Sequence, residues 1–400
     1  MKVALVSSDN SYLVQRGGKH VYQKLLEKFL SLKGIRVTTY YPGREYYHIS
    51  SFRKAILALR YGSLRFWDTF ERRKVFLENL KGFFGSIEFA DEDIVHCQDV
   101  LPALSLPNSK RTILTVHGYF AYEVIANNYR GRESSREKEL RNLLAIEEKA
   151  YNNSSHIVCV DRERRDYLVE EHKIPIGKIT VLHNAVDTDK FFPVSDQEKA
   201  SIRRRLGLPE SKLLVLIPAR FSPEKGVVFA AQASARLKEN NDMFFLFIGG
   251  GPQRNEIESI TQAQRNTLIL DAISHDEFDL YFKAADIVLL PSIPFNNVRE
   301  GTSMSLLEGM ACGKIVISTR VGGMAEVIEN GYSGFFVEQE SSKSIADILM
   351  EFSKDFSQYN IIGANASRVV RERYSFELYV EKMLTIYKQY LIDSESDSSF

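Results

Sequence analysis

The sequence predicts an α/β protein built from two doubly wound parallel sheets. Short apolar runs alternate with longer amphipathic segments along the chain, which is the pattern of parallel strands joined by helical crossovers. The chain has 400 residues, and 44% of them are hydrophobic, which is ample for two separate cores. Sheets of this class bind ligands beyond the carboxyl ends of their strands. We therefore look for functional residues at those ends.

The bulk properties of the chain exclude several classes of function. Its 52 basic and 52 acidic residues cancel, so global charge gives no case for a nucleic-acid partner. Cys97, Cys159 and Cys312 lie in apolar runs at no metal-ligand spacing, which indicates buried free thiols in a reducing compartment. The opening apolar run is too short for the core of a signal peptide, and no run reaches the length of a membrane span. We expect a cytoplasmic protein.

The first half opens with a strand, a loop, a helix and a second strand. The strands are expected at residues 3–6 and 37–40, and Gly17 and Gly18 precede the helix between them. Glycines at that position let the backbone approach a ligand closely, although a plain helix-entry turn explains them as well. The helix should end at Gly34 and bury an apolar stripe formed by Val21, Leu25, Phe29 and Leu32.

Four further strands are expected in the first half, at residues 94–97, 112–116, 156–160 and 179–182. His117 directly follows the second of these and precedes Gly118. A histidine at a strand end can donate a hydrogen bond to a ligand oxygen. A lone histidine is more often structural, so both interpretations stay open at this point.

Residues 52–84 form an unusual basic segment, with eight Lys or Arg against three acids and interleaved aromatics such as Trp67, Phe83 and Phe84. One interpretation is a basic surface that contacts an anionic membrane or a charged ligand. The other is a solvated helical pair whose aromatics face the core. We favour the second.

A domain boundary is expected where the first sheet ends and a polar stretch precedes the next apolar run. This gives an amino-terminal domain at 1–190 and a carboxyl-terminal domain at 191–375, followed by a helix at 376–392 and a frayed tail at 393–400. The last helix has an apolar stripe that should pack back on the first domain. The stripe consists of Phe376, Val380, Met383, Tyr387 and Tyr390.

The second half begins with a strand at 213–217, which leads into a loop flanked by Arg220 and Lys225. This loop enters a helix at 227–237, so two cations and a helix N-terminus can converge on a diphosphate. A glycine turn that includes Gly249 and Gly250 follows the next strand, but it does not match the dinucleotide fingerprint.

Residues 299–326 form the stretch around which we expect the rest of the chain to be organised. Glu300 lies in a polar loop after the apolar run 286–291, and Thr302 or Ser303 can cap the helix that follows. The backbone N–H groups of its first turn form a site for phosphate or sugar oxygens. Glu300 and Glu308 are carboxylates that can accept paired hydroxyl hydrogens, although in isolation both would be read as solvated helix-start residues.

This segment resembles the E-x7-E signature of the retaining GT-B glycosyltransferases of the GT4-like (glycosyl transferases group 1) family. The loop with Arg220 and Lys225 resembles the family's Gly-Arg-x4-Lys-Gly pattern, with Ala219 in place of the first glycine. Ala185 likewise replaces a glycine that the family usually has at the domain junction. The resemblance covers most of the chain. It implies two Rossmann-like domains that face a central cleft.

The resemblance also implies roles for particular residues. Glu300 would orient the donor sugar, Glu308 would hold the ribose hydroxyls, and Arg220 and Lys225 would carry charge on the leaving phosphate. His117 would point at the donor sugar. The other implied donor-binding residues are Gly17, Gly18, Gly249, Gly250, Thr302, Ser303, Met304 and Ser305.

The implied function is transfer of a sugar, with retention, from a nucleoside-diphosphate sugar to a glycan, glycolipid or other hydroxyl acceptor. UDP is the expected nucleotide, and contact with the inner face of a membrane would run through residues 52–84. No cofactor is expected. Asp91 with Asp93, and Asp187 with Asp189, fit a metal-binding D-x-D pattern, but their positions give no reason to expect metal. A GT-B nucleotide-sugar epimerase and a non-catalytic sugar-nucleotide scaffold remain alternatives.

Overall fold

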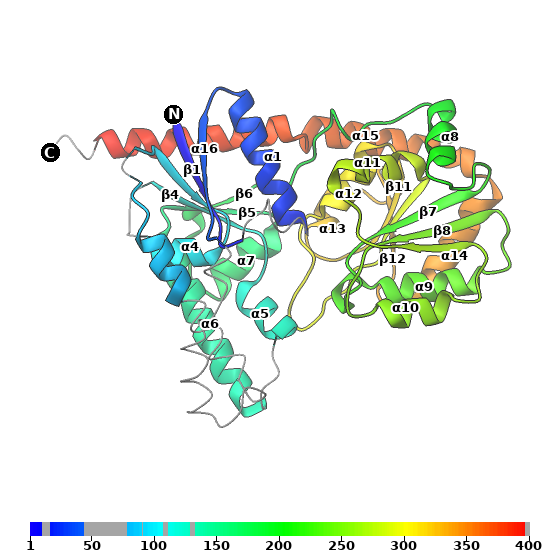
Figure 1. Cartoon of the computed structure of the whole chain (residues 1–400), viewed down its shortest axis with the longest axis horizontal. Coiled ribbons are helices and arrows are strands. Elements are labelled where there is room, and N and C mark those ends of the chain that lie inside the picture. The colour runs from blue at the N-terminus through cyan, green and yellow to red at the C-terminus, as the bar shows by residue number, and fades with distance from the viewer. Residues whose placement is uncertain (10–16, 44–77, 90, 107–110, 129–132, 397–400) are drawn as a thin grey trace. The chain divides into compact units, whose positions relative to one another are not determined.

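The computed structural model of the chain describes residues 1–9, 17–43, 78–89, 91–106, 111–128 and 133–396 (Figure 1). The chain divides into two compact units, each with its own sheet. Unit 1 contains Met1–Leu182 and Val380–Phe400, and unit 2 contains His183–Tyr379. The division falls before residue 190 because Val186 is held by unit 2. Its N–H donates to the carbonyl of Tyr374 at 2.9 Å, and its carbonyl accepts from the N–H of Phe376 at 2.9 Å.

Unit 1 is built on six parallel strands in the order β2-β1-β3-β4-β5-β6. The strand order reverses on either side of β1, as in doubly wound sheets. The predicted strands of the first half are confirmed, with ends that differ by at most one residue. The strands are β1 Lys2–Val6, β2 Arg36–Tyr40, β3 Ile94–Cys97, β4 Thr112–Val116, β5 His156–Cys159 and β6 Ile179–Val181.

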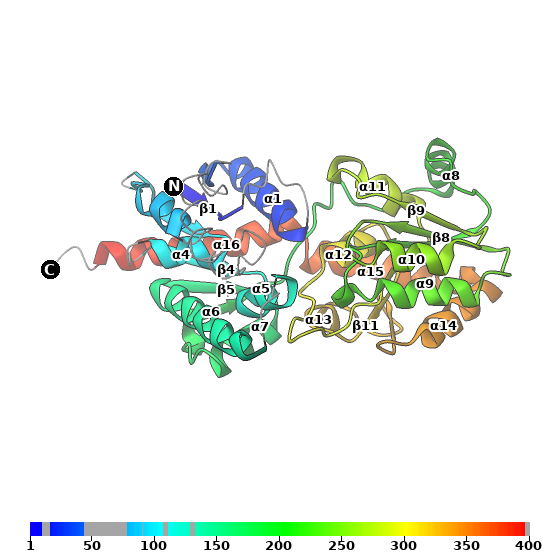
Figure 2. The same ribbon diagram turned by 60° about the horizontal axis from the view of Figure 1, so that its bottom comes forward.

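Helices cover both faces of the first sheet. They are α1 Gly18–Leu32, α4 Val100–Ser105, α5 Phe120–Asn128, α6 Glu133–Asn153, α7 Arg162–Glu170, the 3-10 helix η3 Ile176–Lys178 and α16 Phe376–Ser396. Helices α1 and α16 lie on one face, and α4, α6 and α7 lie on the other (Figures 1 and 2). Helix α16 begins in unit 2 and continues into unit 1 at Val380.

The two apolar stripes predicted for unit 1 have different outcomes. For α16 the prediction is confirmed at Phe376, Val380, Met383 and Tyr387, which are all buried. For α1 it is confirmed only at Phe29, which is buried. Val21 and Leu25 are partly buried and Leu32 is 70% exposed, whereas Tyr22, Leu26 and Leu30 are buried instead. Leucines occur on both sides of α1, and the fully buried Tyr22, which was not counted as apolar, lies on the side that is buried.

Unit 2 has a second sheet of six parallel strands in the order β12-β11-β10-β7-β8-β9. The order reverses between β7 and β10, so ligands are expected beyond the carboxyl ends of these strands. The strands are β7 Leu213–Pro218, β8 Met243–Ile248, β9 Thr267–Leu270, β10 Ile287–Leu290, β11 Ile315–Thr319 and β12 Phe335–Val337. The predicted α/β class with two parallel sheets is thus confirmed.

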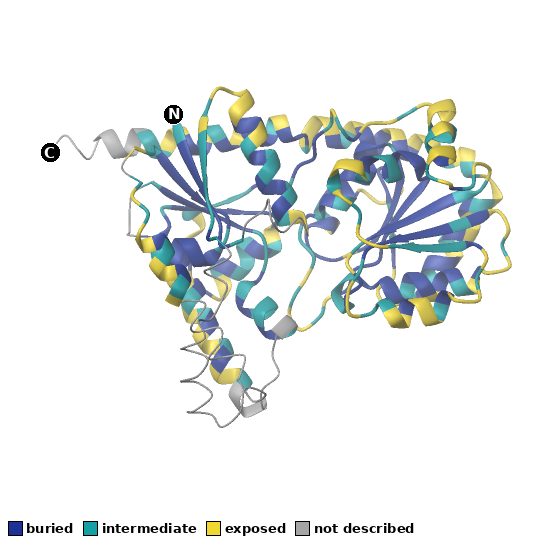
Figure 3. Cartoon of the chain, viewed as in Figure 1, coloured by how far each residue is buried: buried dark blue, intermediate teal, exposed yellow. Residues whose placement is uncertain are grey.

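Helices also cover both faces of the second sheet. They are α8 Asp196–Arg205, η4 Pro223–Lys225, α9 Val227–Arg236, α10 Arg254–Thr261, α11 His275–Ala284, α12 Met304–Ala311, α13 Met324–Val327, α14 Ser342–Lys354, η5 Phe356–Tyr359 and α15 Asn360–Arg373. One hydrophobic cluster packs α9, α10 and α14 on the sheet, and another packs α11, α12 and α15 on it. The central strands are buried, the edge strands β9 and β12 are mostly of intermediate burial, and the outward helix faces are exposed (Figure 3).

The basic segment 52–84 is described only from residue 78. In the described part, Leu80 and Phe84 are buried in the core of unit 1, and the rings of Phe83 and Phe84 lie 5.0 Å apart. These residues therefore pack inward. The interpretations of the segment as a membrane or ligand surface fall on residues 52–77, which lie outside the described residues.

The three cysteines are buried and free, as predicted. Burial raises the pKa of each thiol, for Cys312 to about 12. Among the residues that the structure describes, no helix combines the length and the apolarity needed to cross a bilayer.

Candidate functional site

The loop after β7 is fixed from beneath by the glycine turn that follows β8. The N–H of Phe221 donates to the carbonyl of Gly250 at 2.9 Å, and the Phe221 ring is buried. A Cβ on Gly249 would lie 2.0 Å from the carbonyl oxygen of Ala219, and one on Gly251 would lie 2.4 Å from that of Phe221. Gly249 is thus required by backbone packing. Gly250 faces open space in the described part of the chain.

Arg220 stands on this loop with its side chain 57% exposed. Its Nε donates to Ser222 Oγ at 3.1 Å, and its guanidinium pairs with the carboxylate of Glu224. Ser222 Oγ also donates to Glu224 Oε1 at 2.6 Å. Burial alone would raise the pKa of Glu224, but the hydrogen bonds from Ser222 and Arg220 hold it below its usual value. Arg220 is therefore held on the loop while its outer surface stays accessible.

Lys225 and Glu300, which lie far apart in the sequence, form an ion pair. Lys225 ends η4, and Gly226 follows at φ 60°, where a Cβ would lie 1.9 Å from the carbonyl oxygen of Pro291. The loop of Glu300 is thus in close contact with the start of α9. The structure brings one predicted cation and one predicted carboxylate of the site together.

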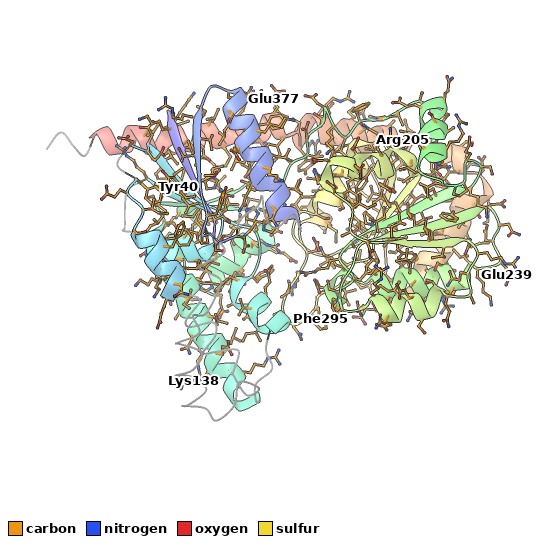
Figure 4. The ribbon with its side chains drawn as sticks, in the orientation of Figure 1. Tyr40, Lys138, Arg205, Glu239, Phe295 and Glu377 are labelled. Carbon is orange, nitrogen blue, oxygen red and sulfur yellow. The ribbon has the colours of Figure 1, made fainter. Side chains whose placement is uncertain are left out.

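The loop before Glu300 is folded by its own turn, with Phe295 at its edge (Figure 4). Phe295 and Val298 exchange backbone hydrogen bonds of 2.9 and 2.8 Å. The two residues between them, Asn296 and Asn297, have φ angles of 49° and 63°. Asparagine tolerates this left-handed region better than most residues, so the turn is well suited to its sequence.

The start of α12 lies directly after this loop. Ser303 occupies the N-cap position, as predicted, but its side chain makes no capping hydrogen bond. Thr302 is buried, and its carbonyl accepts from Asn184 Nδ2 at 2.7 Å. A Cβ on Gly323 would lie 2.5 Å from the Thr302 nitrogen. The turn is therefore fixed by packing, and the first N–H groups of α12, from Met304 and Ser305, are not satisfied by a side-chain cap.

Glu308 lies one turn further along α12, and its side chain is only 3% exposed. Its Oε1 is 3.1 Å from Nε2 of His275, the first residue of α11. His275 was not predicted from the sequence, because nothing in its local sequence places it beside a glutamate that is distant in the chain. The predicted donor-binding residues of the second half thus lie at the carboxyl ends of β7, β8 and β10 or on the elements that follow them.

The carboxyl ends of the strands in unit 1 carry a charged cluster around Lys19. Lys19 Nζ lies 2.7 Å from Asp9 Oδ2 and 3.1 Å from Asp99 Oδ2. Burial would lower the pKa of Lys19, but the charges of Asp99 and Asp9 raise it. Gly17 caps α1 at φ 99°, where glycine is favoured, and Gly18 follows it as the exposed first helical residue. Lys19 is therefore held between two carboxylates, and His20 Nε2 lies 3.8 Å from Asp9 Oδ2 in the same cluster.

His117 lies at the end of β4, with its ring centroid 4.7 Å from that of Tyr22. Burial, followed by the charges of Lys19 and other cations, holds its pKa well below the usual range, so the imidazole is neutral. Its Nε2 is buried and has no hydrogen-bond partner in the described chain, and the same holds for both amide atoms of Gln98 at the end of β3. Gln98 was not predicted from the sequence, because only burial distinguishes this glutamine from a surface one.

The loop of His117 is held by a buried arginine. Arg164 Nε donates to the carbonyl of His117 at 3.0 Å, its guanidinium pairs with Asp161, and it lies over the ring of Tyr119. The positions of His117 and Tyr119 are therefore determined by a residue of α7.

The two D-x-D segments have backbone partners. Asp187 Oδ1 accepts from the N–H of Asp189 at 3.2 Å, and Asp93 Oδ2 accepts from the N–H of Lys2 at 2.7 Å. Within the described ranges, no group of three or more His, Cys, Asp or Glu residues could hold a metal ion.

Two doubly wound units, one of them with cations and carboxylates beside a helix N-terminus, define a two-domain α/β protein suited to a nucleotide or sugar ligand. Comparison with known families gives the particular class. A model of the glycosyl transferases group 1 matches residues 198–369, and a model of glycosyltransferase family 4 matches residues 16–190. The chain belongs to the GT4-like glycosyltransferases, as the resemblance in its motifs predicted.

Characterised and uncharacterised relatives agree with this assignment. An uncharacterized glycosyltransferase of Methanocaldococcus jannaschii is 23% identical over 398 residues, which cover 97% of this chain and 98% of the relative. The UDP-Gal:alpha-D-GlcNAc-diphosphoundecaprenol alpha-1,3-galactosyltransferase of Escherichia coli is 25% identical over 281 residues, which cover 68% of this chain and 67% of the relative.

Solved structures show the same GT-B fold. The sucrose-phosphate synthase of Thermosynechococcus elongatus superimposes with a TM-score of 0.73 at 21% identity, covering 97% of this chain and 98% of that one. Anabaena Alr3699/HepE in complex with UDP-glucose superimposes with a TM-score of 0.67 at 16% identity, covering all of both chains.

Proposed function

We propose that the protein is a retaining glycosyltransferase that transfers a sugar from a UDP-sugar to a hydroxyl group of a glycan or lipid-linked acceptor. Family membership supports glycosyl transfer. The names of the Escherichia coli relative and of the Anabaena complex favour UDP and, for the former, a lipid-linked acceptor. In this proposal unit 2 binds the donor, unit 1 binds the acceptor, and the protein acts in the cytoplasm, at the membrane if its acceptor is lipid-linked.

The observation that carries the proposal is the ion pair of Lys225 with Glu300. A diphosphate competes with Glu300 for the lysine, and a sugar offers hydroxyl hydrogens that replace the lysine at the glutamate. One ligand that carries both groups therefore satisfies both partners. Departure of the nucleoside diphosphate builds negative charge on its phosphate, and Lys225 and Arg220 stabilise that charge more in the transition state than in the ground state.

The roles of the remaining predicted residues follow from this arrangement. The N–H groups at the start of α12, over Thr302, Ser303, Met304 and Ser305, would bind phosphate or sugar oxygens. Retention would place departure and attack on the same face of the sugar, with a donor phosphate oxygen taking the acceptor proton. No enzyme carboxylate is then needed as a base, and no metal is needed to neutralise the leaving group.

In unit 1, Gln98 and His117 would meet hydroxyl groups. The Gln98 amide offers two N–H donors and an acceptor oxygen, and the neutral imidazole of His117 offers one donor or one acceptor. Both kinds of group match a hydroxyl, which donates and accepts.

The test is product analysis with purified full-length protein. Candidate UDP-sugars are incubated with polyprenyl-diphosphate sugars and simple glycosides, with and without EDTA, and the anomeric configuration of any product is read by NMR. We expect UDP release that depends on the acceptor, an unchanged anomeric configuration and activity in EDTA. Conversion of the donor sugar without acceptor would indicate an epimerase, and donor binding without any conversion would indicate a scaffold.

A further inference from the structure

The contact between His275 and Glu308 joins the first residue of one helix to the interior of the next. The Glu308 carboxylate is nearly inaccessible to solvent, whereas the His275 side chain is 25% exposed. Placing a carboxylate in such an environment is costly unless hydrogen-bond donors surround it. His275 supplies a hydrogen bond to one oxygen, Oε1, at 3.1 Å. The second oxygen has further lone pairs, which can accept other hydrogens.

The imidazole is itself held in place by the segment that follows the first unit. Lys190 Nζ donates to the backbone carbonyl of His275 at 2.6 Å. The ring of His275 lies 5.8 Å from the ring of Phe191, which is buried and packs edge-on against Phe282 of α11 at 5.7 Å. Ser274 caps α11 by accepting from the N–H of Asp276 at 3.3 Å. Both the backbone and the ring of His275 are therefore anchored.

We propose that His275 is a positioning residue that orients the Glu308 carboxylate for the ribose of the donor. The inference rests on the proposed function, in which Glu308 accepts hydrogen bonds from the ribose hydroxyls. With Oε1 fixed by the imidazole, the plane of the carboxylate is fixed, and Oε2 is left to accept from the 2′ and 3′ hydroxyls. This is the same logic by which an outer hydrogen bond orients a histidine that ligates a metal.

A positioning role for His275 predicts a difference between nucleotides with and without ribose hydroxyls, which a purely structural contact does not predict. If His275 only joined α11 to α12, its loss would weaken the binding of every nucleotide by the same factor. If it orients the carboxylate, its loss weakens nucleotides that have ribose hydroxyls and leaves those without them almost unchanged. The ratio of the two affinities therefore reports on the role, independently of the stability of the protein.

The experiment is calorimetric titration of full-length protein with UDP and with 2′,3′-dideoxy-UDP. Hydrogen bonds to a charged group correspond to roughly tenfold or more in affinity, so the wild-type protein should bind UDP about tenfold more tightly than the dideoxy compound. In His275→Ala the ratio should fall to about twofold or less. His275→Gln keeps an N–H donor and should retain most of the ratio.

A matched control is available in the same unit. His183 Nε2 lies 2.9 Å from Glu326 Oε2, and His183 is exposed to a similar extent as His275. His183→Ala therefore removes another histidine–glutamate contact and should leave the ratio unchanged. His275→Met, of similar volume but without a donor, should behave as His275→Ala does, and it replaces the alanine variant if that variant does not fold.

The outcomes separate this inference from the proposed function. If the wild type discriminates and the His275 variants discriminate equally well, or lose affinity for both nucleotides by the same factor, the positioning role is overturned. If the wild type binds UDP and its dideoxy analogue equally, the ribose role of Glu308 is wrong, and the inference falls with it. If the wild type binds none of UDP, GDP and ADP, the proposed function itself is contradicted.

Discussion

The candidate ligand-binding residues at the strand ends of the two units differ in whether their polar atoms have partners within the described chain. In unit 2 the charged side chains of the site have partners of the other sign or of hydrogen-bonding character. Arg220 pairs with Glu224, Lys225 pairs with Glu300, and Glu308 contacts His275. In unit 1, Gln98 and His117 are uncharged, and their buried polar atoms lack partners in the described chain.

The difference indicates what each unit has to accommodate. Ion pairs such as Lys225–Glu300 can be exchanged for a ligand that carries both an anion and hydroxyl groups, so the charged groups remain satisfied before and after binding. Unpartnered amide and imidazole atoms are costly while they stay buried. A neutral ligand with hydroxyl groups, or water in its absence, removes that cost. In the proposed function, the site of unit 2 would therefore hold the sugar nucleotide, and the uncharged groups of unit 1 would meet the hydroxyl groups of the acceptor.

The largest effect should come from removing a cation of unit 2. Lys225→Ala and Arg220→Ala should each lower kcat by about 100- to 1000-fold, because the charge that grows on the leaving diphosphate loses a preorganised partner. Steady-state kinetics with a UDP-sugar measure this. Lys343→Ala is the control, since it removes an exposed lysine that pairs with Asp347 on the surface of α14. Normal turnover by both site variants would contradict the assignment.

Replacing the carboxylate of the pair should separate binding from turnover. Glu300→Gln removes the group that competes with the diphosphate for Lys225, so UDP should bind as tightly as before or severalfold more tightly. Turnover should still fall by about tenfold or more, because the sugar loses a charge-assisted hydrogen bond. Calorimetry with UDP and initial rates with the UDP-sugar give the two quantities. Weaker UDP binding by this variant would show that the Lys225–Glu300 pair must stay intact for the nucleotide.

In unit 1, Gln98→Leu should weaken the binding of the acceptor without weakening the binding of UDP. The variant buries an apolar group of similar size in place of an amide without partners, so the free energy of unfolding should stay the same or rise by about 1 kcal/mol. The acceptor KM should increase by about tenfold, while the affinity for UDP is unchanged. Urea denaturation and acceptor titrations test this. A large loss of stability would mean that the amide is satisfied in the folded protein, which would remove the contrast between the units.

A further prediction concerns the dependence of stability on pH in unit 1. Burial lowers the pKa of His96 to about 3, and its ring nitrogens contact Tyr387 and Thr115 at 2.7 Å. In the unfolded chain His96 takes up a proton near pH 6.5, whereas in the folded chain it does so only near pH 3. The free energy of unfolding therefore falls as the pH drops from 6.5 towards 3. Between pH 6.5 and 5 the loss should be about 2 kcal/mol from His96.

The matched variant for this prediction is His96→Asn, which does not titrate. It should be less stable than the wild type at pH 7.5, because it loses the contacts of the ring, but it should lose less stability between pH 6.5 and 5. Urea denaturation at several pH values gives both slopes. Equal slopes would show that His96 is protonated in the folded protein at an ordinary pH.

The sequence sufficed for the sheets, and it singled out Lys225 and Glu300, which the structure brings together in an ion pair. Strands such as β3 and β4 are continuous apolar runs that end at a polar residue, so their bounds follow from composition. Arg220, Lys225, Glu300 and Glu308 were recognisable because their spacing is set by one loop and one helix, which are local features.

The features that could not be predicted from the sequence depend on contacts between segments that are distant in the chain. The buried face of α1 was assigned correctly only at Phe29, because that face includes Tyr22, whose ring packs against His117 at the end of another strand. His275 was missed for the same reason, since its partner lies on a different helix. Gln98 has no local signature at all, and only the burial of both its amide atoms draws attention to it.

The central claim is that unit 2 binds a nucleoside diphosphate through Lys225, and calorimetric titration of the wild-type protein and Lys225→Ala with UDP tests it most directly. We predict saturable binding by the wild type and a loss of affinity of about tenfold or more in the variant, because a charged hydrogen bond to phosphate is removed. Lys343→Ala should bind as the wild type does. Equal UDP affinity in the wild type and in Lys225→Ala would contradict the account.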